Sequence, residues 1–328
     1  MNIAFIIGNG FDLQNNLKTS FFDFFEYVSN EGLLDDSNYI YRIYKKESNT
    51  AKGDEWSNFE EKLGELTFDI PEKIDVDKFI SDLLKFRNDF IDYMIRQQEI
   101  YSIGDEEAEK SIYTTLENFY DKLKDNEKSI IKNKLNSVSK VNVYFINFNY
   151  TNTLDILLNK VSKEIRIGNN RFVIHKPISV HRTLTDGTFL GVDNETQLNA
   201  KVFNKIQLNG LIKPNSIENY ESDDVKQAKS ILKSSSIMFI FGMSLGRTDE
   251  SWWKIIAEGI QKTHEKRYLI INEYKDDEKK HPFLYLNNID SVKANFLQHL
   301  DNDSSNNLSE KIFISFMANN ILRNNRSD

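Results

Sequence analysis

The sequence contains no cysteine among its 328 residues. Disulfide bonds, cysteine nucleophiles and thiolate-ligated zinc are therefore excluded. Long apolar segments are also missing, so no membrane span is expected. The N-terminus lacks the basic leader and the cleavage site of a signal peptide. These absences predict a cytoplasmic protein with no membrane partner.

An excess of positive charge is missing as well. The formal net charge is −8, which disfavours a broad basic surface for nucleic acid. The sequence does contain enough apolar material for a sizeable core, because 39% of its residues are hydrophobic. Its length and composition suit one large domain or two modest ones.

The most informative segment is the first one. Ile3 to Ile7 form an apolar run, which indicates a strand covered on both faces, as in a parallel sheet. Gly8-Asn9-Gly10 follows directly, and such a turn can bring backbone N–H groups up to a phosphate. Leu13 stands where the dinucleotide fingerprint has its third glycine. A tight turn that binds no ligand is therefore the alternative interpretation.

The pattern changes over residues 31–140. Apolar residues recur there at helical spacing, and charged residues fill the other faces. We interpret 31–140 as a helical insertion or lid. The nucleotide-binding domain is then predicted to comprise residues 1–30 and 141–328.

Strand and helix patterns alternate along the rest of the chain. A helix is expected to begin near Thr19 or Ser20, either of which suits an N-cap. Strand patterns occur at 141–147, 171–175, 179–181, 188–192, 236–242 and 267–272, and helix patterns at 151–161, 223–233 and 250–262. Gly168-Asn169-Asn170 signals a turn. This order predicts an α/β fold, a Rossmann-like parallel sheet with helices on both faces and a large helical insertion.

Polar residues follow several of the predicted strands. Ligands of such sheets bind beyond the carboxyl ends of the strands. The residues there are Gly8 to Asp12, Phe148 to Thr151, His181 with Arg182, and Gly242 to Asp249. Glycines and hydroxyls suit phosphate and ribose, and an Asn with a His suits the activation of a hydroxyl or water. The alternative is structural, since Asn149 and Asp249 also suit helix caps.

These segments together resemble the bacterial abortive-infection family AbiH. The matching motifs are Gly-Asn-Gly-Phe-Asp-Leu at 8–13, Leu-Lys-Thr at 17–19, Trp-x-x-x-Glu at 56–60, Phe-Asn-Tyr-Thr at 148–151 and Gly-x-Ser-Leu-Gly-x-x-Asp at 242–249. The resemblance runs from the first residue to about Trp253. It implies a bacterial anti-phage effector that aborts infection.

The AbiH motifs are in turn similar to those of sirtuin-like NAD-binding domains, whose Asn and His form the catalytic pair. This resemblance implies that Asn149 orients a water or a ribose hydroxyl and that His181 is the general base. It also implies NAD as substrate or ligand. The residues expected to bind it are Gly8, Asn9, Gly10, Phe11, Asp12, Thr19, Tyr150, Thr151, Gly242, Ser244 and Asp249.

The chain departs from the family pattern after the histidine. Arg182 stands where the pattern has glycine, and it could crowd the site or contact a phosphate. Met243 stands where relatives often carry a polar residue or His. His175 is a second candidate for the catalytic histidine. His181 is preferred because the expected Gly-Val-Asp element follows it, ending at Asp193.

The missing cysteines bear on the reaction that the resemblance implies. Sirtuin deacetylases generally use a Cys-ligated zinc ribbon to build the acyl-lysine groove, and this chain cannot form one. No zinc is therefore expected, and NAD hydrolysis or nucleotide binding is favoured over lysine deacylation. We expect an enzyme resembling an NAD glycohydrolase, in which water replaces nicotinamide at the anomeric carbon of the ribose.

Two other functions remain open at this point. A metal-dependent nuclease-type effector would require that Asp12, Asp193 and Asp249 converge on a metal. A non-catalytic nucleotide sensor would make Arg182 the mark of a lost active site. A second copy of the chain or a phage-derived trigger would be a further partner in any of these cases.

Overall fold

The computed structural model describes residues 1–33, 35–48, 59–70, 74–184, 190–219, 223–261, 266–274, 281–300, 308–316 and 321–323. The strands are β1 (Asn2–Ile7), β2 (Lys140–Asn147), β3 (Glu164–Ile167), β4 (Asn170–Ile174), β5 (Ile178–Ser179), β6 (Ile237–Phe241), β7 (Tyr268–Glu273) and β8 (Ile312–Phe316). The helices are α1 (Gly10–Gln14), α2 (Phe21–Asn30), α3 (Tyr39–Ser48), α4 (Phe59–Leu66), α5 (Val76–Ile100), α6 (Asp105–Asn118), α7 (Asp125–Asn136), α8 (Thr153–Leu158), α9 (Lys205–Leu211), α10 (Lys213–Asn219), α11 (Asp223–Ser234), α12 (Glu250–Gln261) and α13 (Pro282–Leu297).

The described strands form one sheet in the order β3-β4-β2-β1-β6-β7-β8, and β5 pairs with β2 beyond the end of β4. Every pairing is parallel except the hairpin of β3 and β4. The fold is therefore a mixed α/β fold with one mostly parallel sheet, as predicted. The hairpin turns at Gly168, whose φ is +56°, a left-handed conformation that glycine adopts readily.

The apolar first strand lies in the middle of the sheet, between β2 and β6. From β1 the chain builds the strands on one side and then crosses to β6 on the other side. The strand order therefore reverses between β1 and β6. In open α/β sheets the crevice at this switch point is the usual place for a ligand.

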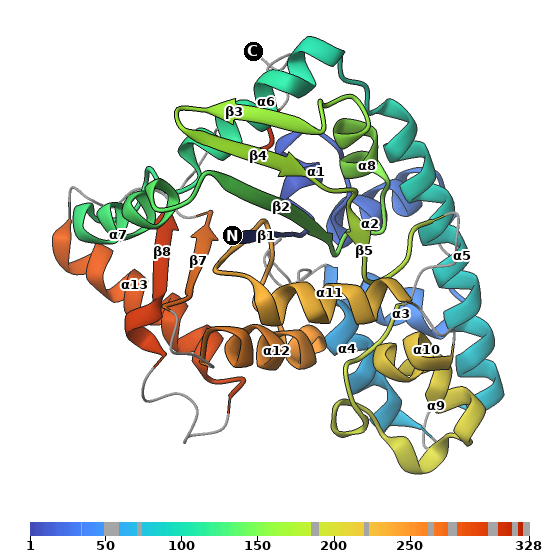
Figure 1. The fold of residues 1–328 in the computed structure, drawn as a ribbon. Coiled ribbons are helices and arrows are strands. Elements are labelled where there is room, and N and C mark those ends of the chain that lie inside the picture. The colour runs from blue at the N-terminus through green and yellow to red at the C-terminus, as the bar shows by residue number, and fades with distance from the viewer. Residues whose placement is uncertain are drawn as a thin grey trace.

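Helices cover both faces of the sheet (Figure 1). Side chains alternate along β1, so Ile3, Phe5 and Ile7 pack against α6 and α7 on one face. Ala4 and Ile6 point to the other face, where α11, α12 and α13 complete the core. Such two-sided burial explains why the strand reads as a continuous apolar run.

A third hydrophobic core lies beside the sheet, and we call it the helical lobe. It joins apolar residues of α2, α3, α4 and α5 to Leu184 and to apolar residues within 190–212, which come later in the chain. Its centre is aromatic: Phe59 and Phe86 stack with ring centroids 4.8 Å apart, and Phe24 meets Phe86 edge to face at 5.4 Å. The division of the chain at residues 31 and 140 stays a prediction.

Several predicted elements have the expected positions. Ser20 caps α2 by accepting a hydrogen bond from the N–H of Asp23, whose carboxylate accepts from the N–H of Ser20. The predicted strand at 188–192 is wrong in its described part. Only Val192 pairs there, in an isolated bridge to Ile212, because Leu190 and Val192 pack into the helical lobe instead of the sheet. Residues 188 and 189 lie outside the described residues.

Over the described ranges, every helix is too short or too polar to cross a bilayer.

Candidate functional site

A pocket of about 840 Å³ lies beyond the carboxyl ends of β1, β2, β6 and β7. This volume is in the range of small-molecule sites. The sheet side contributes Gly8, Asn9, Gly10, Phe148, Asn149, Tyr150, His181, Gly242, Met243, Ser244, Asp249, Asn272, Glu273 and Tyr274. The helical lobe contributes Phe21, Phe22, Glu60, Phe90 and Met94. The pocket therefore lies between the sheet edge and the lobe, at the predicted place.

The two glycine turns contact each other directly. The N–H of Gly8 donates to the carbonyl of Phe241 at 2.9 Å, and the N–H of Gly10 donates to that of Gly242 at 2.8 Å. A Cβ on Gly10 would lie 2.4 Å from the Cα of Gly242. Gly242 has a φ of +67°, and a Cβ on it would lie 2.7 Å from the Cα of Gly10. These glycines are required for the close approach of β1 and β6, and two of the N–H groups expected to face a phosphate are used in that contact.

Asn9 and Thr19 bind each other across the first turn. The hydroxyl of Thr19 donates to Oδ1 of Asn9 at 2.6 Å, and Nδ2 of Asn9 donates to the carbonyl of Thr19 at 3.1 Å. Both residues line the pocket. The pair fixes the turn relative to the start of α2, so these two predicted residues shape the pocket wall together.

Three predicted binding residues lie beneath the pocket instead of lining it. Phe11 is fully buried in the sheet core. Asp12 is fully buried too, and its carboxylate accepts hydrogen bonds from the hydroxyls of Thr151, at 2.6 Å, and Thr153. Burial raises the pKa of Asp12 to about 6, against the lowering effect of the two threonine hydroxyls. Asp12 and Thr151 thus join the turn after β1 to the turn after β2.

Asn149 lines the pocket with a side-chain amide that has polar atoms available to a ligand. Its side chain is buried, yet neither Oδ1 nor Nδ2 has a hydrogen-bond partner among the described residues. Its backbone N–H donates to Oδ1 of Asn147 at 3.0 Å, which holds the loop after β2 in place. Buried amides are normally satisfied, so an unpartnered amide that lines a pocket is suited to a ligand or water.

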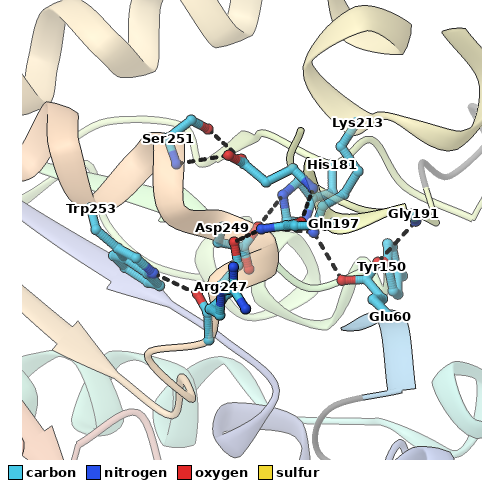
Figure 2. Close-up of polar contacts among 12 residues, drawn as sticks. Glu60, Tyr150, His181, Gly191, Gln197, Lys213, Arg247, Asp249, Ser251 and Trp253 are labelled. Atoms are coloured by element: carbon cyan, nitrogen blue, oxygen red, sulfur yellow. Dashed lines mark hydrogen bonds and ion pairs between the residues drawn. The ribbon is translucent and has the colours of Figure 1, made fainter. Parts of the chain in front are cut away.

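His181 lines the same pocket as Asn149 and is also buried. Its Nε2 is 3.2 Å from Oδ1 of Asp249, at ion-pair distance but outside hydrogen-bond geometry (Figure 2). The ring of Phe148 meets the imidazole edge to face at 5.1 Å. These neighbours restrict the ring and leave a carboxylate behind it, as in a histidine base oriented by an acid.

Asp249 and His181 belong to a larger buried ionic cluster. Nζ of Lys213 lies 3.0 Å from Oδ1 of Asp249 and 2.9 Å from Oε2 of Glu60 (Figure 2). The other oxygen of Glu60 accepts from the hydroxyl of Tyr150, at 2.9 Å, and from the N–H of Gly191, at 3.2 Å. The cluster therefore connects α4 and α10 of the lobe region to the motif after β6.

The pKa values in this cluster depend on charge as well as burial. Burial alone would raise the pKa of Asp249, but the Lys213 ammonium and His181 hold it well below its usual range. Burial alone would lower the pKa of Lys213, but Asp249 and Glu60 raise it. Burial and Glu60 raise the pKa of Tyr150. The two carboxylates and the one ammonium thus leave one negative charge beside His181.

A second network supports the segment that carries Asp249. Asp193 accepts from the hydroxyl of Ser251, at 2.6 Å, and from its N–H, at 3.2 Å. Gln197 accepts from the N–H of Asp193 at 2.8 Å and donates to the carbonyl of Arg247 at 2.8 Å (Figure 2). The predicted Gly-Val-Asp element is therefore adjacent to the Gly242–Asp249 motif and holds it in place.

The two departures from the family pattern differ in their position relative to the pocket. Arg182 has a φ of +58°, a left-handed conformation in which glycine carries no strain. The glycine that the pattern has at this position therefore suits the backbone, and Arg182 is not among the lining residues described. Met243 lines the pocket. His175 stacks on Tyr144 with ring centroids 4.3 Å apart and does not line the pocket.

The three aspartates proposed as metal ligands bind different groups. Asp12 binds threonine hydroxyls, Asp193 binds Ser251, and Asp249 binds Lys213. No group of three or more carboxylate, histidine or cysteine side chains suited to a metal occurs within the described ranges. The convergence that a metal-dependent nuclease would require is therefore not found in them.

Two residues of the site were missed by the sequence analysis. Glu60 was matched to a motif but given no role, and Lys213 was not identified. The available signal for Lys213 was a lysine beside Pro214 within the apolar segment that includes Leu211 and Ile212. The companion residue Trp56 lies outside the described residues.

Comparison with known proteins identifies the family. The family model described as "Bacteriophage abortive infection AbiH" matches residues 4–272. Searches of curated proteins and of solved structures gave no significant match. The match includes the residues of the site from Gly8 to Asn272 and the great majority of the chain, and the lining residues Glu273 and Tyr274 follow directly after it. The chain therefore belongs to the AbiH family of bacteriophage abortive-infection proteins.

Proposed function

We propose that this AbiH protein aborts phage infection by binding NAD in the pocket and hydrolysing the bond between nicotinamide and ribose. The observation that carries the proposal is the pair of Asn149 and His181, both buried and both in the pocket wall. The amide of Asn149 is unpartnered among the described residues, and His181 has the carboxylate of Asp249 behind it. This pair corresponds to the catalytic pair that the sirtuin-like resemblance implies. The proposal includes a Rossmann-like, sirtuin-like identity for the mostly parallel sheet.

The reaction needs one base and one cation-stabilising group. The C1′–N bond breaks, and nicotinamide leaves as a neutral molecule with the bonding electrons. A water oxygen forms the new bond to C1′, and His181 accepts the proton that this water loses. Asn149 orients the water or the ribose hydroxyls with its free amide.

Positive charge develops on the ribose as nicotinamide leaves. The cluster of Glu60, Asp249 and Lys213 has one more negative than positive charge and contacts His181 through Asp249. A preorganised charge of the opposite sign in a buried site stabilises such a transition state. Ser244, at the exposed rim of the pocket, is proposed to contact the phosphates or the second ribose.

Release of nicotinamide from NAD tests the proposal. His181→Ala is expected to lower the rate by roughly 10²–10⁴-fold, the usual effect of removing a general base. Asn149→Ala is expected to lower it too. His175→Ala is the matched control, since this histidine stacks on Tyr144 away from the pocket, and it should retain the wild-type rate.

The measurement should be made on purified protein and on NAD pools of phage-infected cells that express each variant. Loss of NAD in infected cells for wild type and His175→Ala, but not for His181→Ala, is the expected result. Equal rates for wild type and His181→Ala would refute the assignment of the base. Binding of NAD without release in either setting would make the protein a nucleotide sensor.

A further inference from the structure

The charged groups of the pocket lining are all of one sign. Glu60, Asp249 and Glu273 line the pocket, and neither lysine nor arginine occurs among its described lining residues. The nearest ammonium in the ionic cluster, that of Lys213, is held between Glu60 and Asp249. A ligand at this end of the pocket therefore meets the two carboxylates of Glu60 and Asp249, which share the single ammonium of Lys213.

Aromatic rings surround the same end of the pocket. Phe148 and Tyr150 have ring centroids 5.1 Å and 6.2 Å from that of His181. Phe90, from α5, meets Tyr150 edge to face at 6.1 Å. Aromatic faces combined with carboxylates are the usual environment for an organic cation. Because the site is largely buried, its charges act with less screening than at the surface.

We infer that the end of the pocket formed by Glu60, Phe148, Tyr150 and Asp249 selects a ligand ring that carries a positive charge. This inference rests on the proposed function and adds to it: the preferred ligand is the oxidised dinucleotide, whose nicotinamide ring is cationic. The reduced form has a neutral ring of nearly the same shape. The anionic diphosphate is then directed away from this end, toward the turns after β1 and β6.

The two redox forms of one uncleavable analogue provide matched probes. Carba-NAD has a methylene in place of the ribose ring oxygen, so binding can be measured without turnover. Titration calorimetry of the full chain is expected to give about tenfold tighter binding of the oxidised than of the reduced analogue, as one buried charge interaction allows. Added salt should weaken this preference much less than it would weaken a preference set by charges on the surface.

Charge-neutral variants test where the preference arises. Glu60→Gln and Asp249→Asn should each reduce the ratio of the two affinities severalfold. Asp155→Asn is the control, because this carboxyl lines a different cavity beside α8, and it should leave the ratio unchanged. Far-ultraviolet circular dichroism verifies that each variant is folded.

The outcomes separate this inference from the proposed function. Equal affinities for the two analogues, or an unchanged ratio in both Glu60→Gln and Asp249→Asn, would overturn the charge selection and leave the NAD proposal standing. No binding of either analogue would overturn both. Tighter binding of the reduced analogue would overturn the inference, because it would show that the pocket prefers a neutral ring.

Discussion

At the scale of the residue, burial decides what Asp12 can do. The side chain is fully buried and bound to two threonine hydroxyls, and burial raises its pKa to about 6 from an ordinary value of 3.8. In the folded protein the carboxyl therefore keeps its proton to a higher pH than in the unfolded chain. Its favourable contribution to stability is fully present below pH 3.8 and is lost as the pH rises through about 6.

This sign predicts a pH dependence that Asp12→Asn removes. The wild-type free energy of unfolding should decrease between pH 4 and pH 7 by up to about 3 kcal/mol more than that of the variant. Urea denaturation at each pH measures the difference. Parallel curves for the two proteins would show that Asp12 titrates at the same pH in the folded and unfolded states.

Single residues also show how far the sequence can predict the site. The motifs singled out Asn149 and His181, and both residues line one pocket. They do so because the carboxyl ends of parallel strands lie at one edge of the sheet. The engagement of the Gly8 and Gly10 N–H groups was not predictable. It depends on the turn after β6, more than 230 residues later, and no local pattern shows the distance between two turns.

At the scale of the element, the contact between the turns after β1 and β6 makes the glycines irreplaceable. Gly10→Ala would put a methyl group 2.4 Å from the Cα of Gly242. Because both partners are backbone, the strands must move apart, and we expect a loss of about 2–3 kcal/mol in unfolding free energy. Thermal and urea denaturation measure it.

Gly210→Ala is the control for that substitution. Gly210 is exposed in α9, and a Cβ there would meet nothing within 4 Å. Alanine favours a helix more than glycine does, so this variant should gain up to about 1 kcal/mol. A stable Gly10→Ala protein would show that the two strand ends can separate without cost.

Elements with one strong pattern were predictable, and those without one were not. The strands β1 and β6 read as apolar runs because both of their faces are covered. The interpretation of the sequence ended at Asn272 and so included neither α13 nor β8. Helix α13 exposes Phe283, Leu284 and Leu286, which weakens the apolar periodicity that would have identified it.

At the scale of the whole molecule, Lys213 connects the helical lobe to the sheet. Its side chain is 3% exposed and lies between Glu60 of α4 and Asp249 beyond β6. Lys213→Met would leave two carboxylates buried without their cation. A loss of about 3–5 kcal/mol in unfolding free energy is expected, because a broken buried ion pair leaves uncompensated charge.

A double-variant cycle tests that cause. Lys213→Met combined with Glu60→Gln should cost less than the sum of the two single variants. Lys233→Met is the surface control, since Lys233 and Glu258 pair 2.9 Å apart with both side chains nearly half exposed, and it should change stability by less than about 1 kcal/mol. Additive effects in the cycle would mean that the lysine acts through packing alone.

The helical lobe shows the limit of sequence reasoning at this scale. Helical periodicity identified α4 and α5, but it could not show that Leu184 and residues within 190–212 complete their core. That partnership is set by the path of the chain after β5. The placement of Glu60 in the pocket follows from the same path, which is why the residue was assigned to a motif without a role.

The pocket is bounded by the hydrophobic core of the helical lobe on one side and by the two cores of the sheet on the other. Phe90 and Met94 belong to the core of the lobe, and Phe148 and Phe241 belong to those of the sheet. A molecule bound in the pocket contacts the lobe and the sheet at the same time and stabilises the contact between them. By thermodynamic linkage, the stability of the contact between the lobe and the sheet then increases with the concentration of that molecule in the cell.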